Sequence, residues 1–322
     1  MADDRDPRPA PEDDQHTSVA QLLDERSRLL AIGYRMLGSR AEAEDAVQET
    51  YVRWYRLGAH EQAGIRNPAA WLTTAMTRVC LNVLDSARHR RESYVGEWLP
   101  EPLSAGSPLG RGAEAASTDP ADQAALADEV TMALMVVLDS LTPAERVALV
   151  LHDVFGYRFD EIAEMVGRTP QAVRKLASTA RKHVDDERRR DSTPVQQREV
   201  VESFVDACLT GDVTALIERL DPAVTVISDG GGRVRAALRP VVGADRVARF
   251  LTGAFRKSTD LVASLEDGGH ETRMVLSRAD TVAAVVTFRV RDGLVSNVWV
   301  TLNPDKLATW GERTDETHDT VD

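Results

Sequence analysis

The hydrophobic period of this chain changes near residue 197, and that change most limits the folds the chain can adopt. Before it, apolar residues recur every three or four positions, which is the spacing of a buried helix face. After one or two further helices, apolar and polar residues alternate over short runs, as in strands with one buried face. This order predicts a multi-domain protein with two all-α helical domains and a C-terminal α+β domain.

The first helical domain is predicted over residues 17–97. Ser39 and Glu42 have the spacing of a capping box, in which two side chains bond the free backbone amides at a helix start. Asn67 followed by Pro68 marks another helix start, because proline suits the first helical position. These signals place two helices with defined beginnings inside this domain.

A first linker, at residues 98–119, is rich in glycine, serine, alanine and proline. It separates the first domain from a second helical domain predicted over residues 120–190. A short second linker, at 191–196, leads to the α+β domain at 197–312. The first linker opens with Trp98-Leu99-Pro100-Glu101-Pro102, whose prolines stiffen the backbone and whose tryptophan offers a large apolar surface. These properties suit a contact between domains.

The segment Phe159–Ser178 predicts a helix-turn-helix, because Ala163, Gly167 and Val173 have the spacing of its close-packed, turn and inward positions. In such units the second helix enters the major groove, and flanking cations hold phosphates. The exposed face of that helix offers these candidate DNA contacts: Gln171, Arg174, Lys175, Ser178, Arg181 and Lys182. We expect the first three at or near base edges, and Arg181 and Lys182 at the DNA backbone. The alternative is an ordinary solvated basic face.

The helix that follows Ser39 carries an acidic face. At about 100° per residue, Asp45, Gln48 and Glu49 lie together, roughly opposite the apolar stripe. Such a face is either a solvated helix surface or a docking surface for a basic partner.

The helix that begins at Pro68 combines hydroxyls, cations and an aromatic ring on its polar side. This combination suits a partly unpaired DNA strand, whose bases stack and whose phosphates need neutralising. Its candidate contacts are Trp71, Thr74, Thr77, Arg78, Asn82, Arg88, Arg90 and Arg91. The alternative is core packing for the tryptophan and solvent exposure for the others.

The formal net charge of −13 argues at first against a nucleic-acid partner. Between Arg168 and Arg190, however, eight Lys or Arg stand against three acids. A basic patch on an acidic chain predicts a protein that binds DNA weakly alone and needs a partner. Two cysteines fit a reducing cytoplasm, and the acidic tail at residues 1–16 resembles no signal peptide. No membrane span is expected, and residues 313–322 are expected to form a second disordered tail.

The C-terminal region predicts a curved sheet with a covering helix. Four strands are expected after a helix at Gly243–Phe255, and one before it, at Val224–Ser228. The four lie at Leu261–Leu265, Arg273–Leu276, Thr281–Val290 and Leu294–Leu302. Asp292-Gly293 between the last two is a strong hairpin signal. We expect the strands to pair antiparallel.

Several blocks of the chain resemble the extracytoplasmic-function sigma factors. Residues 38–50 resemble their polymerase-docking helix, residues 67–91 their −10-reading helix, and residues 141–184 their −35-reading domain. Three further motifs resemble the subgroup that carries a SnoaL-like C-terminal extension. They are Trp98-Leu99-Pro100-Glu101-Pro102, Asp229-Gly230-Gly231-Gly232 and Asn303-Pro304-Asp305-Lys306-Leu307. The resemblance extends from about residue 18 to 310.

The resemblance implies a sigma factor that takes core RNA polymerase, through its β′ and β subunits, to promoter DNA. Asp45, Gln48 and Glu49 would then contact the β′ clamp coiled coil. The C-terminal domain would be a cone-shaped α+β fold that controls the factor in cis, with the three motifs between domains. Most relatives are held inactive instead by a separate anti-sigma protein.

Two other functions remain open from the sequence. One is a ligand-sensing helix-turn-helix regulator that binds duplex DNA without polymerase. The other is a SnoaL-type cyclase or hydratase tethered to DNA, which needs a positioned acid or base in an apolar pocket. The residues show no catalytic pair, because His270 lies in a turn and Asp229 stands beside three glycines. We therefore predict no enzyme, cofactor or metal site, and the sequence identifies no small ligand.

Overall fold

The computed structural model describes residues 13–92, 94–104, 107, 109, 130–258, 260–268, 271–279 and 281–310, with only the backbone given for 13–24 and 87–92. Part of the first linker, His270 and the C-terminal tail therefore lie outside the described residues. The predicted N-terminal tail reaches too far into the chain, because the first helix already begins at Asp13.

The first helical domain consists of α1 (Asp13–Leu37), α2 (Arg40–Arg56), α3 (Ala59–Gly64) and α4 (Pro68–Glu92). The Ser39 side chain accepts a hydrogen bond from the Glu42 amide, as predicted for the start of α2. In α1, Gly33 is buried against Ala43 of α2 and Met76 of α4. A small residue at this position lets the three helices approach closely.

The second helical domain contains α6 (Met132–Ser140), α7 (Pro143–Leu149), a π-helical turn η1 (Val150–Val154), α8 (Phe159–Val166) and α9 (Pro170–Arg188). Gly167 ends α8 with φ +66°, and Thr169 caps α9 through the Ala172 amide. The predicted helix-turn-helix is confirmed at both points. The π-helical turn was not expected from the sequence.

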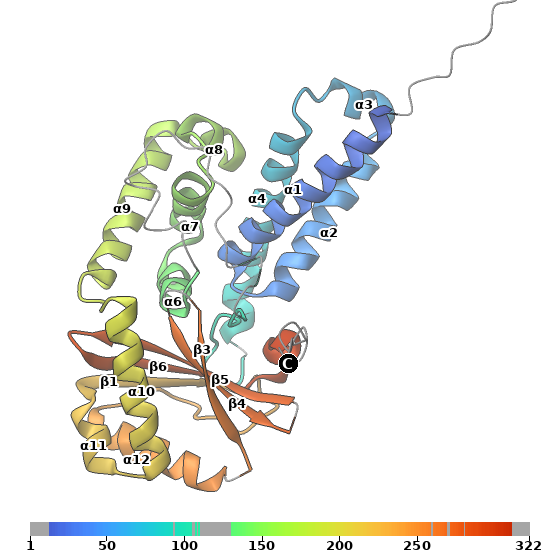
Figure 1. Ribbon diagram of the computed structural model, residues 1–322. Helices are drawn as coiled ribbons and strands as arrows, with labels where there is room; N and C mark the ends of the chain where they lie inside the picture. Colours follow the sequence, from blue (N-terminus) through green and yellow to red (C-terminus); the bar gives the residue numbers. More distant parts are fainter. Residues whose placement is uncertain are drawn as a thin grey trace, which may run out of the picture.

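The two helical domains share one hydrophobic core. Leu29 and Ile32 of α1 and Met76 of α4 belong to the same buried cluster as Leu151 of η1 and Val173 of α9. Figure 1 shows α1 to α4 beside α6 to α9, with both groups standing over the same sheet. The two domains are therefore packed together rather than strung out along a linker.

The C-terminal domain begins with α10 (Pro194–Thr210) and α11 (Val213–Glu218). Its six strands are β1 (Leu220–Asp229), β2 (Val241–Val242), β3 (Val262–Asp267), β4 (Thr272–Arg278), β5 (Thr281–Arg291) and β6 (Leu294–Thr301). Helix α12 (Ala244–Lys257) lies between β2 and β3, and α13 (Pro304–Leu307) with the 3-10 turn η2 (Ala308–Trp310) follows β6.

The sheet has the strand order β2-β1-β6-β5-β4-β3. The predicted hairpin at Asp292-Gly293 is confirmed, and both residues have positive φ. The expectation of purely antiparallel pairing is wrong at one place, because β1 and β6 run parallel. The chain passes through α12 and four further strands between them, which is long enough for a parallel return.

The second linker, predicted at 191–196, is shorter and attached to the sheet. Asp191 forms a β-bridge with Arg291, and the Ser192 amide donates to the Val290 carbonyl. Helix α10 already begins at Pro194. The segment that follows the second helical domain is thereby bonded to the last residues of β5.

Both faces of the sheet are covered, because successive strand residues point to opposite sides. Val226, Val286 and Val298 belong to a core shared with α10 and α12. On the other face, Trp299 packs with Leu99 and Met132, which precede or begin the second helical domain. Figure 1 shows the helical domains on one side of the sheet and α10 to α12 on the other.

Gly33 offers a test of this packing. A Cβ at this position would lie 2.6 Å from Met76 Cε and 3.0 Å from Ala43 Cβ. We expect Gly33→Val to lower the free energy of unfolding by about 1–3 kcal/mol through overpacking. Gly64→Ala is the control, since a Cβ there meets nothing within 4 Å. Thermal unfolding followed by circular dichroism measures both, and an equal Tm for the two variants would refute the close approach.

Candidate nucleic-acid interface and interdomain latch

The acidic face of α2 is exposed. Asp45, Gln48 and Glu49 all face solvent, while the opposite side of the helix is buried. Glu49 forms an ion pair with Arg53, 3.0 Å between Oε1 and Nε. An exposed i,i+4 pair of this kind contributes only a few tenths of a kcal/mol, ~0.3–0.5. The carboxylates are therefore available to a basic partner.

Helix α9 presents its predicted DNA-binding face to solvent. Val173, Ala177, Ala180 and Val184 are buried along the other side. On the outer face the exposed residues are Gln171, Arg174, Lys175, Ser178 and Lys182. The Arg174 guanidinium lies 5.2 Å from the ring centre of Phe159 in α8, which holds it near the start of the helix.

Arg181 differs from the other residues of this face. Its guanidinium donates two hydrogen bonds, 2.5 and 2.6 Å long, to the buried carboxylate of Asp153. Asp153 lies in the π-helical turn η1. Arg181 therefore positions α9 against η1, and a contact with the DNA backbone would compete with this pair.

The predicted DNA-binding side of α4 is only partly open. Asn82 is exposed, while Trp71 and Thr74 are half-buried, with the Trp71 ring against the edge of Trp54. The side chains of Arg88, Arg90 and Arg91 lie outside the described part of the chain. One assignment needs correction: Thr77 is fully buried, because its hydroxyl is satisfied by the Thr73 carbonyl one turn earlier. Thr77 cannot reach DNA in this structure.

Contacts with the second helical domain cover part of α4. The Arg78 guanidinium donates to the backbone carbonyl of Met165 in α8, 3.1 Å away. The Tyr157 hydroxyl donates to Thr73 Oγ1 at 2.8 Å, and Arg28 of α1 lies over the Tyr157 ring. A predicted DNA contact, Arg78, is thus used to hold the two helical domains together.

Asp229, at the end of β1, is fully buried and accepts four hydrogen bonds. Its Oδ2 accepts from Lys306 Nζ at 2.7 Å and from the Leu99 amide at 3.0 Å. Its Oδ1 accepts from the Tyr94 hydroxyl at 2.6 Å and from the Gly231 amide at 3.0 Å. Asp229 and these partners form what we call the latch, and it joins segments far apart in the sequence.

Lys306 is the buried cation of the latch. Besides Asp229, its ammonium group donates to the Leu99 carbonyl and lies 4.2 Å from the ring centre of Trp98. Burial, and next the neighbouring Asp229 carboxylate, raise the pKa of the Tyr94 hydroxyl, so it stays a donor. The charges of Asp229 and Lys306 offset each other inside the interface.

The three glycines after Asp229 allow a turn that other residues would strain or block. A Cβ on Gly230 would lie 2.2 Å from the Val234 carbonyl oxygen. Gly231 has φ +63°, and a Cβ there would meet the Asn303 side chain at 2.4 Å. Asn303 in turn donates to the Tyr94 hydroxyl and caps α13 through the Asp305 amide. Asp305 and Pro304 are exposed, and Leu307 is buried.

The motif at residues 98–102 connects the latch to the first helical domain. Glu101 is buried and accepts from the Arg40 amide at the start of α2, 2.8 Å away. The Glu101 amide donates to the Gly38 carbonyl, and the Tyr34 hydroxyl donates to the Glu101 carbonyl. Trp98 packs on Gly38, and Pro100 is also buried. The Glu101 carboxylate thus gives the free Arg40 amide at the start of α2 a partner, and the other two bonds tie the motif to α1 and the turn that follows it.

The 3-10 turn at the end of the described chain holds the same motif from the other side. Trp310 is buried, and its indole Nε1 donates to the Pro102 carbonyl at 3.0 Å. The three predicted interdomain motifs are thus brought together at one place.

The second helical domain is held by residues that the sequence analysis missed. Glu271 accepts from the Met132 amide at the start of α6, 2.8 Å away, and pairs with Arg273 at 2.7 Å. Glu271 and Arg273 are both buried. An anion at a helix N-terminus is favourable, because free amides and the helix dipole point toward it.

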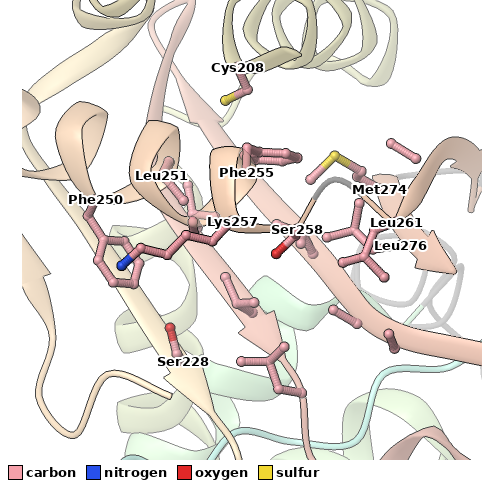
Figure 2. A pocket seen from close by; sticks show the side chains of 18 of the residues that line it. Cys208, Ser228, Phe250, Leu251, Phe255, Lys257, Ser258, Leu261, Met274 and Leu276 are labelled. Carbon is pink, nitrogen blue, oxygen red and sulfur yellow. The ribbon is translucent and has the colours of Figure 1, made fainter. Parts of the chain in front are cut away.

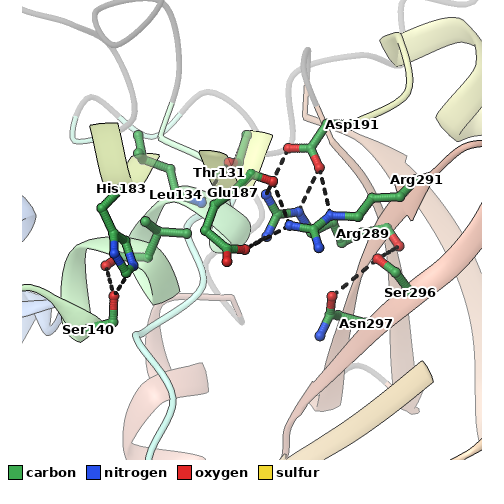
Figure 3. A network of polar contacts seen from close by, with 11 residues as sticks. Thr131, Leu134, Ser140, His183, Glu187, Asp191, Arg289, Arg291, Ser296 and Asn297 are labelled. Carbon is green, nitrogen blue, oxygen red and sulfur yellow. Dashed lines mark hydrogen bonds and ion pairs between the residues drawn. The ribbon is translucent and has the colours of Figure 1, made fainter. Parts of the chain in front are cut away.

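A second attachment lies at the end of α9. Arg289 and Arg291 of β5 pair with Glu187 and Asp191, at N–O distances of 2.7–3.3 Å (Figure 3). Hydrogen bonding from Arg291 lowers the pKa of the Glu187 carboxyl. The alternation of Arg289 and Arg291 with Val290 in an apolar strand was the signal that could have revealed this contact.

The latch accounts for the carboxylate that the sequence offered as a candidate acid. All four hydrogen bonds that this carboxylate accepts come from groups of the latch. Within the described residues, no group of three or more His, Cys, Asp or Glu could hold a metal ion. No helix in the same residues is long and apolar enough to cross a membrane.

Comparison with known proteins gives matches over nearly the whole chain. The family model "Sigma-70 region 2" matches residues 23–90, and "Sigma-70, region 4" matches residues 131–184. The chain is 37% identical over 295 residues to "ECF RNA polymerase sigma factor SigJ" of Mycobacterium tuberculosis, covering 88% of this chain and 90% of that protein. It is 34% identical over 296 residues to "Probable ECF RNA polymerase sigma factor SigI" of the same species, covering 91% and 96%.

A solved structure is similar over the same length. The crystal structure of the Mycobacterium tuberculosis extracytoplasmic function sigma factor SigJ covers 90% of this chain and 98% of its own. The TM-score is 0.65 at 32% sequence identity. The similarity therefore includes the helical domains and the C-terminal domain together.

The latch predicts a large effect for a small change. Asp229→Asn keeps the shape of the side chain but leaves the buried Lys306 ammonium without its counter-charge. We expect the free energy of unfolding to fall by about 3–5 kcal/mol. The double variant Asp229→Asn/Lys306→Met should recover part of that loss, because it also removes the unpaired cation. Urea unfolding measures the three proteins, and a loss below about 1 kcal/mol for Asp229→Asn would show that the pair does not hold the interface.

Proposed function

The chain belongs to the extracytoplasmic-function sigma factors of the sigma-70 family, and on this premise we propose that its C-terminal SnoaL-like domain controls it in cis. A sigma factor directs core RNA polymerase to promoter DNA for transcription initiation. The proposed control is that the latch keeps the two helical domains packed together until polymerase is bound.

The observation that carries the proposal is the single core shared by the two helical domains. We assign α4 to the −10 element and α9 to the −35 element. The elements lie about 25 positions apart, roughly 85 Å along DNA at about 3.4 Å per base pair. A domain of about 100 residues has a radius of gyration of only ~13 Å. Domains in direct contact cannot span that distance, so the closed chain must open to read a promoter.

The same contacts explain how the closed form opposes DNA binding. The Nε–H of Arg78 is used by the Met165 carbonyl, which fixes this side chain toward α8 rather than toward a DNA strand. Opening of the chain must separate α4 of the first helical domain from α8 of the second. The C-terminal domain binds segments of both helical domains and so holds them in contact. Glu101 beside Arg40 anchors the first domain, and Glu271 beside Met132 anchors the second.

The remaining assignments follow from exposure and charge. We assign Asp45, Gln48 and Glu49 to the basic surface of the polymerase β′ clamp, and the exposed polar face of α9 to the major groove. The C-terminal domain is assigned a regulatory role rather than a catalytic one, because the latch occupies the Asp229 carboxylate. The protein would act in the cytoplasm, where polymerase and promoter DNA meet.

Polymerase docking is tested by reversing the charge of α2. Asp45→Lys/Glu49→Lys should abolish capture by core RNA polymerase, since two exposed carboxylates would become repulsive cations. Glu199→Lys/Asp206→Lys is the control, because both residues are exposed acids on α10, far along the chain. Co-purification with core enzyme is the measurement. Retention of the α2 variant at the level of the control would remove the assignment.

Control in cis is tested by run-off transcription with purified core polymerase. If the latch keeps the factor closed, Asp229→Asn should raise the yield of specific transcript several-fold at limiting factor. The triple variant Asp229→Asn/Asp45→Lys/Glu49→Lys serves as the control and should give no transcript. A yield for Asp229→Asn that is equal to or below that of the unmodified chain would overturn the regulatory role.

A further inference from the structure

The C-terminal domain contains a large, half-open cavity on the sheet face that α10 and α12 cover. Its volume is about 1460 Å³, and it lies between α12, the end of α10 and the strands (Figure 2). Apolar side chains dominate the wall, among them Phe250, Phe255, Met274 and Leu276. Small-molecule pockets usually measure about 300–1,000 Å³, so this one has room for a long or polycyclic apolar molecule.

The charged residues of the cavity are all cations. Arg235, Arg249, Arg256, Lys257 and Arg278 line it, and no Asp or Glu is among the described residues that do so. This is the reverse of the chain as a whole, whose net charge is −13. Cations at the mouth of an apolar, low-dielectric cavity concentrate anions there.

Two of these cations are already neutralised, and three are available. Arg249 pairs with Asp245, and Arg278 pairs with Asp260. Arg235, Arg256 and Lys257 are exposed, and no ion pair or hydrogen bond of their side chains is found within the described residues. Figure 2 shows the Lys257 side chain extended along the cavity with Phe250 and Ser228.

Ser228 supplies a polar group inside the cavity. It lines the wall, is 3% exposed, and its hydroxyl has no hydrogen-bond partner among the residues that the structure describes. The hydroxyl oxygen is not among the fully buried polar atoms that lack a partner, so it opens into the cavity, where water or a ligand can bond it. A ligand with an acceptor oxygen would satisfy it.

We propose that the cavity binds an apolar carboxylic acid, a long-chain fatty acid or a molecule of similar shape, with its carboxylate between Lys257 and Ser228. The apolar wall takes the hydrocarbon part, and each buried methylene raises the affinity about fourfold. The unpaired cations take the negative charge, and the Ser228 hydroxyl donates to a carboxylate oxygen.

The cavity and the latch share two short segments of chain. Ser228 lines the cavity, and Asp229, the next residue of β1, points to the opposite face. In α13, Pro304 and Leu307 line the cavity, and Lys306 between them pairs with Asp229. A ligand that moves the end of β1 or α13 therefore shifts the Asp229–Lys306 pair. This regulatory step rests on the proposed control in cis, whereas ligand binding itself does not.

Binding is tested on the full chain with cis-parinaric acid, a fluorescent long-chain fatty acid, and with its uncharged methyl ester. We expect saturable binding of the acid, and weaker binding of the ester by roughly five- to tenfold, since the ester lacks the charge-assisted contact. Lys257→Met should lower the affinity for the acid by the same factor and leave the affinity for the ester unchanged. Arg246→Met, an exposed cation of α12 outside the cavity wall, is the control and should change neither.

A second variant locates the probe. Gly253 of α12 lines the cavity, and a Cβ there meets nothing within 4 Å, so Gly253→Phe should fold and reduce the space. We expect the affinity for acid and ester to fall at least tenfold. The proposed site would be refuted if the unmodified chain showed no saturable binding. It would also be refuted if the Lys257 and Gly253 variants both kept full affinity.

The regulatory step has a separate readout. Run-off transcription by the unmodified chain should change with the acid over the concentration range of its binding, and should not change in Lys257→Met at the same concentrations. Binding without any effect on transcription would overturn the coupling alone. The effect of Asp229→Asn on transcription is measured without ligand. The test of the proposed control in cis therefore does not depend on the outcome of the ligand experiments.

Discussion

The buried pair of Asp229 and Lys306 is the interaction on which the arrangement of the domains depends. Neither group is stable in an apolar interface alone, because a buried unpaired charge is strongly destabilising. The pair is complete only when Leu99, Tyr94 and the glycine turn are also in place. Residues from the first linker, from β1 and from the end of the chain must therefore assemble together. Once they do, the motif at residues 98–102 is fixed, and through Glu101 so is the start of α2.

The sheet connects this ion pair to the rest of the C-terminal domain, because its two faces pack against different parts of the protein. Residues that alternate along a strand point to the helical domains on one side and to α10 and α12 on the other. Trp299 packs on Leu99 and Met132, while its neighbour Val298 belongs to the core below. Neighbouring residues of β6 therefore contact different layers of the protein. In the proposed control, the first face keeps the sigma factor closed, and the second lines a cavity.

Local signals predicted local structure well, and contacts between distant segments could not be predicted in the same way. The capping side chain of Ser39, the left-handed Gly167 and the Asp292-Gly293 turn act within a few residues, so their sequence determines them. The parallel pairing of β1 with β6 and the ion pair of Glu187 with Arg291 join residues 70 or more positions apart, and nothing local encodes them. Thr77 was misassigned because a threonine hydroxyl that bonds its own helix can be buried like an apolar group. The importance of the motifs around Asp229 and Lys306 came from resemblance, and their chemistry from the structure.

The distance between the two helical domains tests the central claim most directly. Spin labels at Ala59→Cys in α3 and Thr179→Cys in α9 would report it by double electron–electron resonance, since both positions are exposed. The native Cys80 and Cys208 are buried, which raises the pKa of each thiol to about 12 and leaves them unreactive. We predict one narrow, short distance in the free chain and a distance longer by tens of ångströms, on the order of the spacing between promoter elements, in the complex with core polymerase and promoter DNA. The same distribution in the free chain and in the complex would contradict the account.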